Sequence, residues 1–197
     1  MLAASQEKKS KQSEPNMNIL LILGLLFFTQ TETTDKYIEA YAYLNKCEHL
    51  REFDKRICKT NNSYQFPINV INEVYPLSVL IFGNEIIEQR IISNMTPNQT
   101  QLSEFVTKFD AEHNFEPFEN KEFEKLFKKN ERSQIYVAFS KPIGNLLFAE
   151  LAYDLSNTGK VNSINELTRF NKSLAVLFIF DKNGKIREVR KKLNQYD

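Results

Sequence analysis

Apolar side chains recur every three or four residues from Asp35 to about Lys59, and this spacing predicts a long amphipathic helix. The two threonines before Asp35 indicate a region that caps its first turn, and the polar stretch 61–63 indicates its end. The apolar stripe consists of Tyr37, Tyr41, Leu44, Cys47, Leu50, Phe53 and Ile57.

Shorter patterns fill the chain between this helix and Asn130. Two prolines inside an apolar stretch predict irregular backbone or short strands, and Gly83-Asn84 ends that stretch. The predicted elements are the irregular segment Phe66–Phe82, a short helix over Glu85–Ser93, a loop over Asn94–Gln101, a short helix over Leu102–Phe109, and another from Pro117 to Phe127.

After Asn130 the apolar positions alternate with a period of two, which is typical of strands. Strands are predicted over Ile135–Phe139 and Leu147–Tyr153, and the run Leu174–Phe180 is apolar on both faces, as in a central strand. Asp181–Gly184 is the strongest turn pattern, because Asn and Gly tolerate the positive φ of a tight reversal. Helices followed by strands predict an α+β fold in which N-terminal helices pack on a C-terminal antiparallel sheet.

A ten-residue apolar run, Ile19–Phe28, precedes this domain. A spanning helix needs about 20 apolar residues, so the run matches the apolar core of a secretory signal better than a membrane anchor. We therefore predict a signal or hydrophobic segment over 1–31, a single α+β domain over 32–197, and export to the periplasm, the cell surface or the medium. Cleavage of the segment stays open, as does the choice between Met1 and Met17 as the start.

Composition excludes several classes of function. A net charge of +1 predicts no strong attraction to nucleic acid, and only five glycines argue against a glycine-rich phosphate loop. Contact with a membrane is expected only through an uncleaved Ile19–Phe28. No cofactor and no metal are predicted.

The two cysteines, Cys47 and Cys58, lie eleven residues apart. In a continuous helix their Cα atoms would be about 16 Å apart, beyond the roughly 7 Å limit for a disulfide. Either the helix breaks between them or both thiols stay unpaired.

His113 is the principal candidate for chemistry, because Asp110, Glu112 and Glu116 lie close to it in the sequence. A histidine beside carboxylates suits general acid–base catalysis or metal binding, although a solvated charged loop gives the same pattern. Ser140 and Lys141 also resemble a Ser–Lys hydrolase pair, but neighbouring residues of a strand point to opposite faces.

Two further patterns allow either a functional or a purely structural interpretation. Asp181 and Asn183 resemble the start of a calcium loop, yet the spacing and closing glutamate of an EF-hand are missing. The basic end of the chain suits an anionic surface or a charged edge strand that prevents aggregation equally well. It consists of Arg187, Arg190, Lys191 and Lys192.

The last third of the chain carries a distinct pattern. Ser140–Ile143 is followed by Asn145 and Ala149, and Leu177-Phe178 precedes Asp181–Lys185. In these residues the chain resembles a group of uncharacterised exported bacterial proteins, in which Ser-Lys/Arg-Pro-Ile ends one strand and a Lys/Asn-Gly-Lys turn joins the last two. The chain departs from that group at Ile186, where tryptophan is usual, and in the missing glycine-rich bend before the penultimate strand. The resemblance covers about 55 residues and implies export and a terminal antiparallel sheet, with no activity to transfer.

Two functions follow as hypotheses, and membrane attachment through an uncleaved Ile19–Phe28 together with the basic C-terminus is a third option. The first is a non-catalytic exported module that binds or supports an unknown protein or cell-envelope component. The second is a small hydrolase or metal-dependent enzyme that uses His113 with Asp110, Glu112 or Glu116.

Overall fold

The computed structural model describes residues 33–54, 67–76, 79–90, 99–155, 161, 163–168 and 172–195. The apolar run Ile19–Phe28 and Cys58 lie outside these ranges. The elements in chain order are a helix over residues 33–44, α2 (Cys47–Leu50), β1 (Asn69–Tyr75), α3 (Val79–Arg90), α4 (Gln99–His113), β2 (Phe118–Glu119), α5 (Glu122–Leu126), β3 (Ile135–Ser140), β4 (Leu146–Tyr153), α6 (Ile164–Thr168), β5 (Lys172–Phe180) and β6 (Ile186–Gln195).

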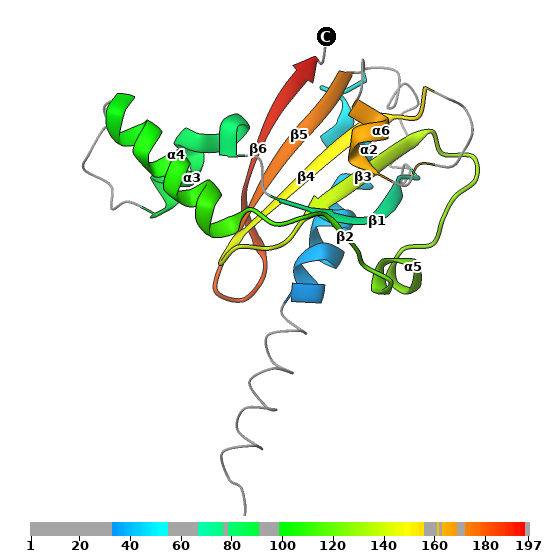
Figure 1. Cartoon of the computed structure of the whole chain (residues 1–197). Helices are drawn as coiled ribbons and strands as arrows, with labels where there is room; N and C mark the ends of the chain where they lie inside the picture. The colour runs from blue at the N-terminus through cyan, green and yellow to red at the C-terminus, as the bar shows by residue number, and fades with distance from the viewer. Residues whose placement is uncertain are drawn as a thin grey trace, which may run out of the picture.

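The described strands form one six-stranded sheet in the order β2-β1-β3-β4-β5-β6 (Figure 1). The predicted α+β class is confirmed, and β3 to β6 form an antiparallel meander. The sheet as a whole is mixed, however, because β1 pairs with β3 in parallel. The chain between these strands contains α3, α4, β2 and α5, which is long enough for the crossover that parallel neighbours require.

Both faces of the sheet are covered. One face packs against the helix over residues 33–44, α2 and α5, whose core side chains include Leu44, Leu50 and Phe123. The opposite face packs against α3, α4 and α6, through side chains that include Phe82 and Phe109. Alternate residues of the central strands supply the two cores, so this three-layer arrangement follows from strands that are apolar on both faces.

The prediction of one continuous helix from Asp35 to about Lys59 is wrong. The helix over residues 33–44 ends in a turn at Asn45, and Lys46 is extended, with ψ at 119°, before α2 begins. The break allows Leu44 and Leu50 to enter the same core, and both are fully buried. Because the helix is not continuous, the separation of about 16 Å calculated for Cys47 and Cys58 no longer applies. Among the described residues Cys47 forms no disulfide, and Cys58 lies outside them.

Three other boundaries differ from the prediction. Gly83 does not end the preceding segment, because α3 runs through it with a kink at Phe82 (φ −122°, ψ 27°). The predicted loop over Asn94–Gln101 is shortened, since α4 begins at Gln99. The single helix expected after Pro117 is instead β2 followed by α5, because the backbone at 118–119 pairs with β1. Within the described residues, no helix is both long and apolar enough to cross a bilayer.

The turn at Asp181–Gly184 is confirmed. Asp181 Oδ1 accepts the N–H groups of Asn183 and Lys185 at 2.8 and 2.9 Å, and Gly184 has φ +73°. These contacts close the turn between β5 and β6, as the hairpin interpretation predicts.

Lys191 and Lys192 of β6 fasten helices to opposite faces of the sheet. Lys191 Nζ donates to the carbonyl oxygen of His49 at 2.8 Å. Lys192 Nζ donates to the carbonyl oxygen of Ile81 at 2.6 Å and lies 2.7 Å from Glu85 Oε1. Lys191 and Lys192 therefore serve to hold the fold together. Any exposed basic surface at this end of the chain would consist of other residues.

Ser140 completes the β3–β4 ladder with its side chain, and its replacement should destabilise the fold. Its Oγ is fully buried and accepts the Phe148 N–H at 3.0 Å. Ser140→Ala leaves that N–H buried without a partner, so we expect the free energy of unfolding to fall by about 1–3 kcal/mol. Urea unfolding measures this, with exposed Ser103→Ala as the control; equal stabilities of the two variants would contradict the assignment.

His49 should make stability depend on pH near neutrality. It stacks on Tyr43 with ring centroids 3.7 Å apart, and burial followed by the charge of Lys191 lowers its pKa, against a smaller raising effect of Glu48. The unfolded chain binds this proton at an ordinary pKa of about 6.5, whereas the folded protein binds it only at lower pH. The free energy of unfolding should therefore fall as the pH drops below neutrality through that range. Chemical unfolding between neutral pH and pH 5 measures the slope, which should be shallower in His49→Gln; identical slopes would refute the linkage.

Candidate functional site

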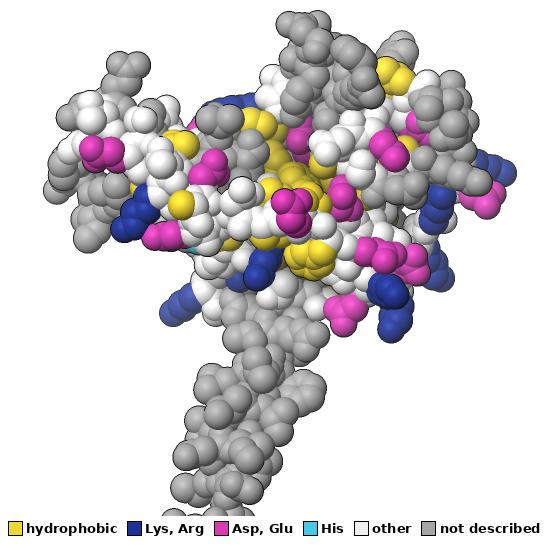
Figure 2. All heavy atoms as spheres, viewed as in Figure 1, with side chains coloured by type: hydrophobic (Ala, Val, Ile, Leu, Met, Phe, Trp, Pro, Cys, Tyr) yellow, Lys and Arg dark blue, Asp and Glu magenta, His cyan; other side chains and the backbone are white. Residues whose placement is uncertain are grey.

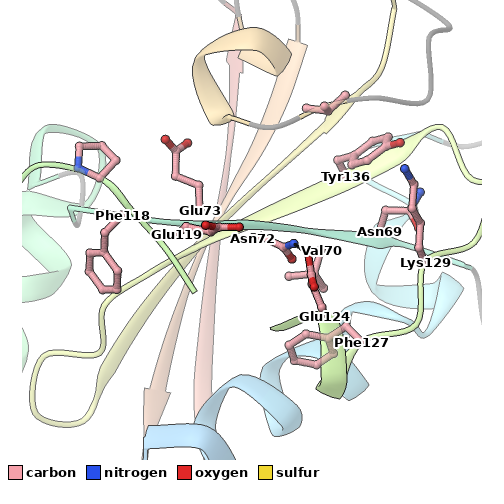
Figure 3. A pocket seen from close by; sticks show the side chains of 12 residues that line it. Asn69, Val70, Asn72, Glu73, Phe118, Glu119, Glu124, Phe127, Lys129 and Tyr136 are labelled. Carbon is pink, nitrogen blue, oxygen red and sulfur yellow. Dashed lines mark hydrogen bonds between the residues drawn. The ribbon is translucent and has the colours of Figure 1, made fainter. Parts of the chain in front are cut away.

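A cavity of about 730 Å³ lies at the β1–β2 end of the sheet (Figure 3). This volume is within the usual range for ligand sites. It is lined by Asn69, Val70, Asn72, Glu73, Pro117, Phe118, Glu119, Glu124, Phe127, Lys129, Tyr136 and Val161.

The cavity wraps around the sheet edge, because residues from both faces of β1 line it. Val70 packs with the core that contains Phe127, whereas Tyr136 belongs to the opposite core, and both Val70 and Tyr136 line the cavity. Asn72 Nδ2 donates to Glu124 Oε1 of α5 at 2.8 Å. Side chains alternate along a strand, so a groove lined by neighbouring residues of β1 follows the edge of the strand.

Two glutamates face each other across β1 and β2. Glu73 and Glu119 are direct partners in the antiparallel register, and both line the cavity. Like charges directly opposite each other destabilise a strand pair. Glu73 Oε2 accepts the backbone N–H of Ile164 at 3.1 Å, which fixes its carboxylate toward α6 (Figure 3). A cation between the two strands would relieve the repulsion.

β2 covers only part of the outer edge of β1. It pairs with Glu73 and Val74, and Asn120 N–H donates to the carbonyl oxygen of Asn72 at 2.6 Å. Among the strands that the structure describes, none pairs with this edge at 69–71. An edge strand presents backbone donors and acceptors that another extended chain can use.

Tyr136 forms the buried end of the cavity wall. Its side chain lies beside Asn69, and burial raises the pKa of its phenol while Asn69 lowers it by a smaller amount. The residue is 3% exposed, and no acceptor for its phenolic proton is found among the described residues. Asn69 itself is committed to the loop before β3, because its Oδ1 accepts the Asn130 N–H at 2.7 Å.

Apolar side chains add a second kind of contact surface. Phe118 is 47% exposed at the edge formed by β2, and Phe127 and Val70 line the same cavity. In the space-filling view, hydrophobic side chains gather in the middle of this face and Asp and Glu side chains lie around them (Figure 2). The site therefore offers backbone pairing, apolar contact and negative charge together.

His113, the candidate from the sequence, lies in a different cavity of about 460 Å³. Glu112, Glu116 and Lys141 line it as well. His113 Nδ1 lies 2.9 Å from the carbonyl oxygen of Phe109, which only accepts, so Nδ1 carries the proton and Nε2 is the basic nitrogen in the neutral ring. The ring also stacks on Phe109, with centroids 4.2 Å apart.

The other candidates from the sequence are distributed differently. Asp110 is exposed and is absent from the residues that line the His113 cavity. Ser140 is fully buried and bonded within the β3–β4 ladder, so it does not form a nucleophilic pair with Lys141. Within the described part of the chain, no three or more His, Cys, Asp or Glu side chains gather closely enough to hold a metal.

The residues around β1 were not identified from the sequence. Glu73, Glu119 and Glu124 are scattered in it, and each is an ordinary surface residue by local pattern. They come together only because the chain forms α3 and α4 after β1 and then returns to β1 with β2 and α5. A local signal for the edge did exist in Pro67 and Pro76, which flank β1.

Comparison with known proteins provides no assignment. The chain matches no protein family, no curated protein and no solved structure at a significant level.

Proposed function

We propose that this protein is a non-catalytic exported binding module that takes up a basic, extended peptide segment of a partner protein or cell-envelope component along the outer edge of β1. The observation that carries the proposal is the partly paired edge of β1 inside an acidic groove. Export is supported by the apolar run Ile19–Phe28, whose length fits a secretory signal.

Backbone pairing accounts for the extended form of the ligand. A peptide strand would pair with the outer edge of β1 at residues 69–71, next to the two residues of β1 that pair with β2. Such strand addition derives its affinity from main-chain hydrogen bonds and its specificity from pockets for alternate side chains. Phe118 and Val70 provide apolar contacts for side chains of the peptide.

Charge accounts for the basic character of the ligand. Three described lining residues are glutamates, at 73, 119 and 124, and Lys129 is the basic residue among them. Lys or Arg side chains from the peptide would neutralise the Glu73–Glu119 pair and add charge-assisted hydrogen bonds. The same field would repel acidic segments, which gives the site a basis for selection.

Replacing the facing glutamates should weaken peptide binding without unfolding the protein. The probe is a fluorescein-labelled nine-residue peptide of alternating lysine and valine, and fluorescence anisotropy measures its Kd. In Glu73→Gln/Glu119→Gln we expect the Kd to rise at least about tenfold, which corresponds to about 1.4 kcal/mol. A glutamine at 73 can still accept the Ile164 N–H, so the fold is retained.

The matched control is Glu104→Gln/Glu131→Gln, which removes the same charge from exposed positions outside the groove. A second probe, N-methylated at alternate residues, keeps the charge of the peptide but cannot pair fully with β1. The proposal fails if the control variant loses as much affinity as the groove variant, or if the methylated peptide binds as tightly as the unmodified one.

A second candidate function is acid–base catalysis at His113. The observation that favours it is the Nδ1 contact with Phe109, which leaves Nε2 basic in a cavity shared with Glu116 and Lys141. This arrangement suits activation of water or a hydroxyl group by Nε2 in a small hydrolase.

His113→Gln tests the catalytic candidate directly. If Nε2 is a general base, hydrolysis of p-nitrophenyl ester and phosphate substrates should fall at least about 100-fold. Thermal unfolding should change little compared with Lys108→Gln on the same helix. Hydrolysis that is undetectable in the wild-type protein, or equal in the variant, would eliminate this function.

A further inference from the structure

A separate cavity of about 410 Å³ lies where three parts of the chain meet. These parts are the first turn of the helix over residues 33–44, the β3–β4 turn and the β5–β6 turn (Figure 1). The cavity is lined by Lys36, Gly144, Asn145, Phe180, Asp181, Lys182 and Arg187. A salt bridge of 3.2 Å between Lys185 and Glu39 holds the β5–β6 turn against the helix beside it.

Positive charge dominates this cavity. Lys36, Lys182 and Arg187 line it, and Asp181 is the acidic residue among the described residues in its wall. The Asp181 carboxylate already serves the turn, because its Oδ1 accepts the Asn183 and Lys185 N–H groups. These backbone hydrogen bonds hold the pKa of Asp181 below its ordinary value, so it remains ionised and bound to the turn.

The side chain of Lys36 lies at the bottom of the cavity and is held in place by a hydrogen bond. The residue is 6% exposed, and its Nζ donates to the carbonyl oxygen of Gly144 at 2.9 Å. Gly144 has φ +58°, a left-handed conformation that glycine adopts without strain. A charged side chain held in a buried position is pre-organised, so little conformational entropy is lost when an anion binds beside it.

Only a few residues separate Lys36 from the apolar run Ile19–Phe28, and this short separation favours one source of the anion. The described helix begins at residue 33, five residues after Phe28. Five residues span at most about 18 Å, and the rise from 33 to Lys36 adds about 4.5 Å. Where Ile19–Phe28 is retained in a bilayer instead of being removed as a signal, the headgroup layer lies at most about this distance from Lys36.

We propose that this cavity binds a phosphate group, and that the group belongs to the headgroup of an anionic phospholipid. Lys36 contacts the phosphate from the floor, and Lys182 and Arg187 contact it from the rim. The site differs from the peptide groove in residues, position and charge, so it does not depend on the function proposed for the β1 edge. The basic C-terminal residues Lys191 and Lys192 are not needed, since they hold helices to the sheet.

The first experiment measures the site without a membrane. Glycerol 3-phosphate is titrated into the full chain, and the amide NMR shifts of Gly144 and Asn145 are followed. We expect saturable shifts in the wild-type protein and a Kd at least tenfold higher in Lys182→Gln/Arg187→Gln. Lys108→Gln/Lys172→Gln, which removes two exposed charges elsewhere, should behave like the wild type. Unchanged shifts in the wild type, or equal Kd values in both double variants, would overturn the proposal.

The second experiment identifies the source of the phosphate. Partitioning of the full chain is measured on phosphatidylcholine vesicles with and without phosphatidylglycerol. Each Lys or Arg near an anionic surface contributes a factor of about five, so the rim variant should lose about 30-fold of its preference for phosphatidylglycerol. The control variant should keep that preference.

The two experiments separate the lipid from a soluble ligand. Binding of glycerol 3-phosphate combined with an unchanged vesicle preference in the rim variant would overturn the lipid assignment in favour of a soluble phosphate ester. Loss in both experiments would support the headgroup. Melting temperatures of the two double variants verify that the rim substitutions leave the fold intact.

Discussion

The fold depends on strands that bury both of their faces. Every residue of β3 is buried, as is every residue of β5 after Lys172. A sheet of this kind must be covered on both sides, which the chain achieves with the helix over residues 33–44, α2 and α5 on one face and α3, α4 and α6 on the other. Lys191 and Lys192 of β6 also contact both helical layers, because neighbouring residues of a strand point to opposite faces of the sheet.

The same constraint leaves the two edges of the sheet unequal. β6 is paired along its length with β5 and carries charged side chains, which is a common protection of an edge. At the other edge, β2 pairs with β1 through two residues. Among the described residues, the groove at β1 combines an edge at 69–71 that no strand pairs with and an excess of glutamates, and we place the proposed peptide site there.

Turns and loops supply the remaining candidate chemistry. Segments far apart in the sequence bring Lys36, Lys182 and Arg187 to one cavity, while His113 at the end of α4 and Lys141 line another. The rigid layers hold these segments in place. Such an arrangement is typical of proteins in which a packed scaffold positions functional side chains on connecting segments.

The sequence by itself determined the elements whose signals are local: the buried strand over Leu174–Phe180, the turn at Asp181–Gly184, and the apolar stripe that contains Leu44 and Leu50. Only the tertiary structure decided the break at Asn45, the parallel pairing of β1 with β3, and the meeting of Glu73 with Glu119. The physical reason is that periodicity and turn preference report the conformation of one segment, whereas strand pairing and convergence of charges depend on how distant segments share a single core.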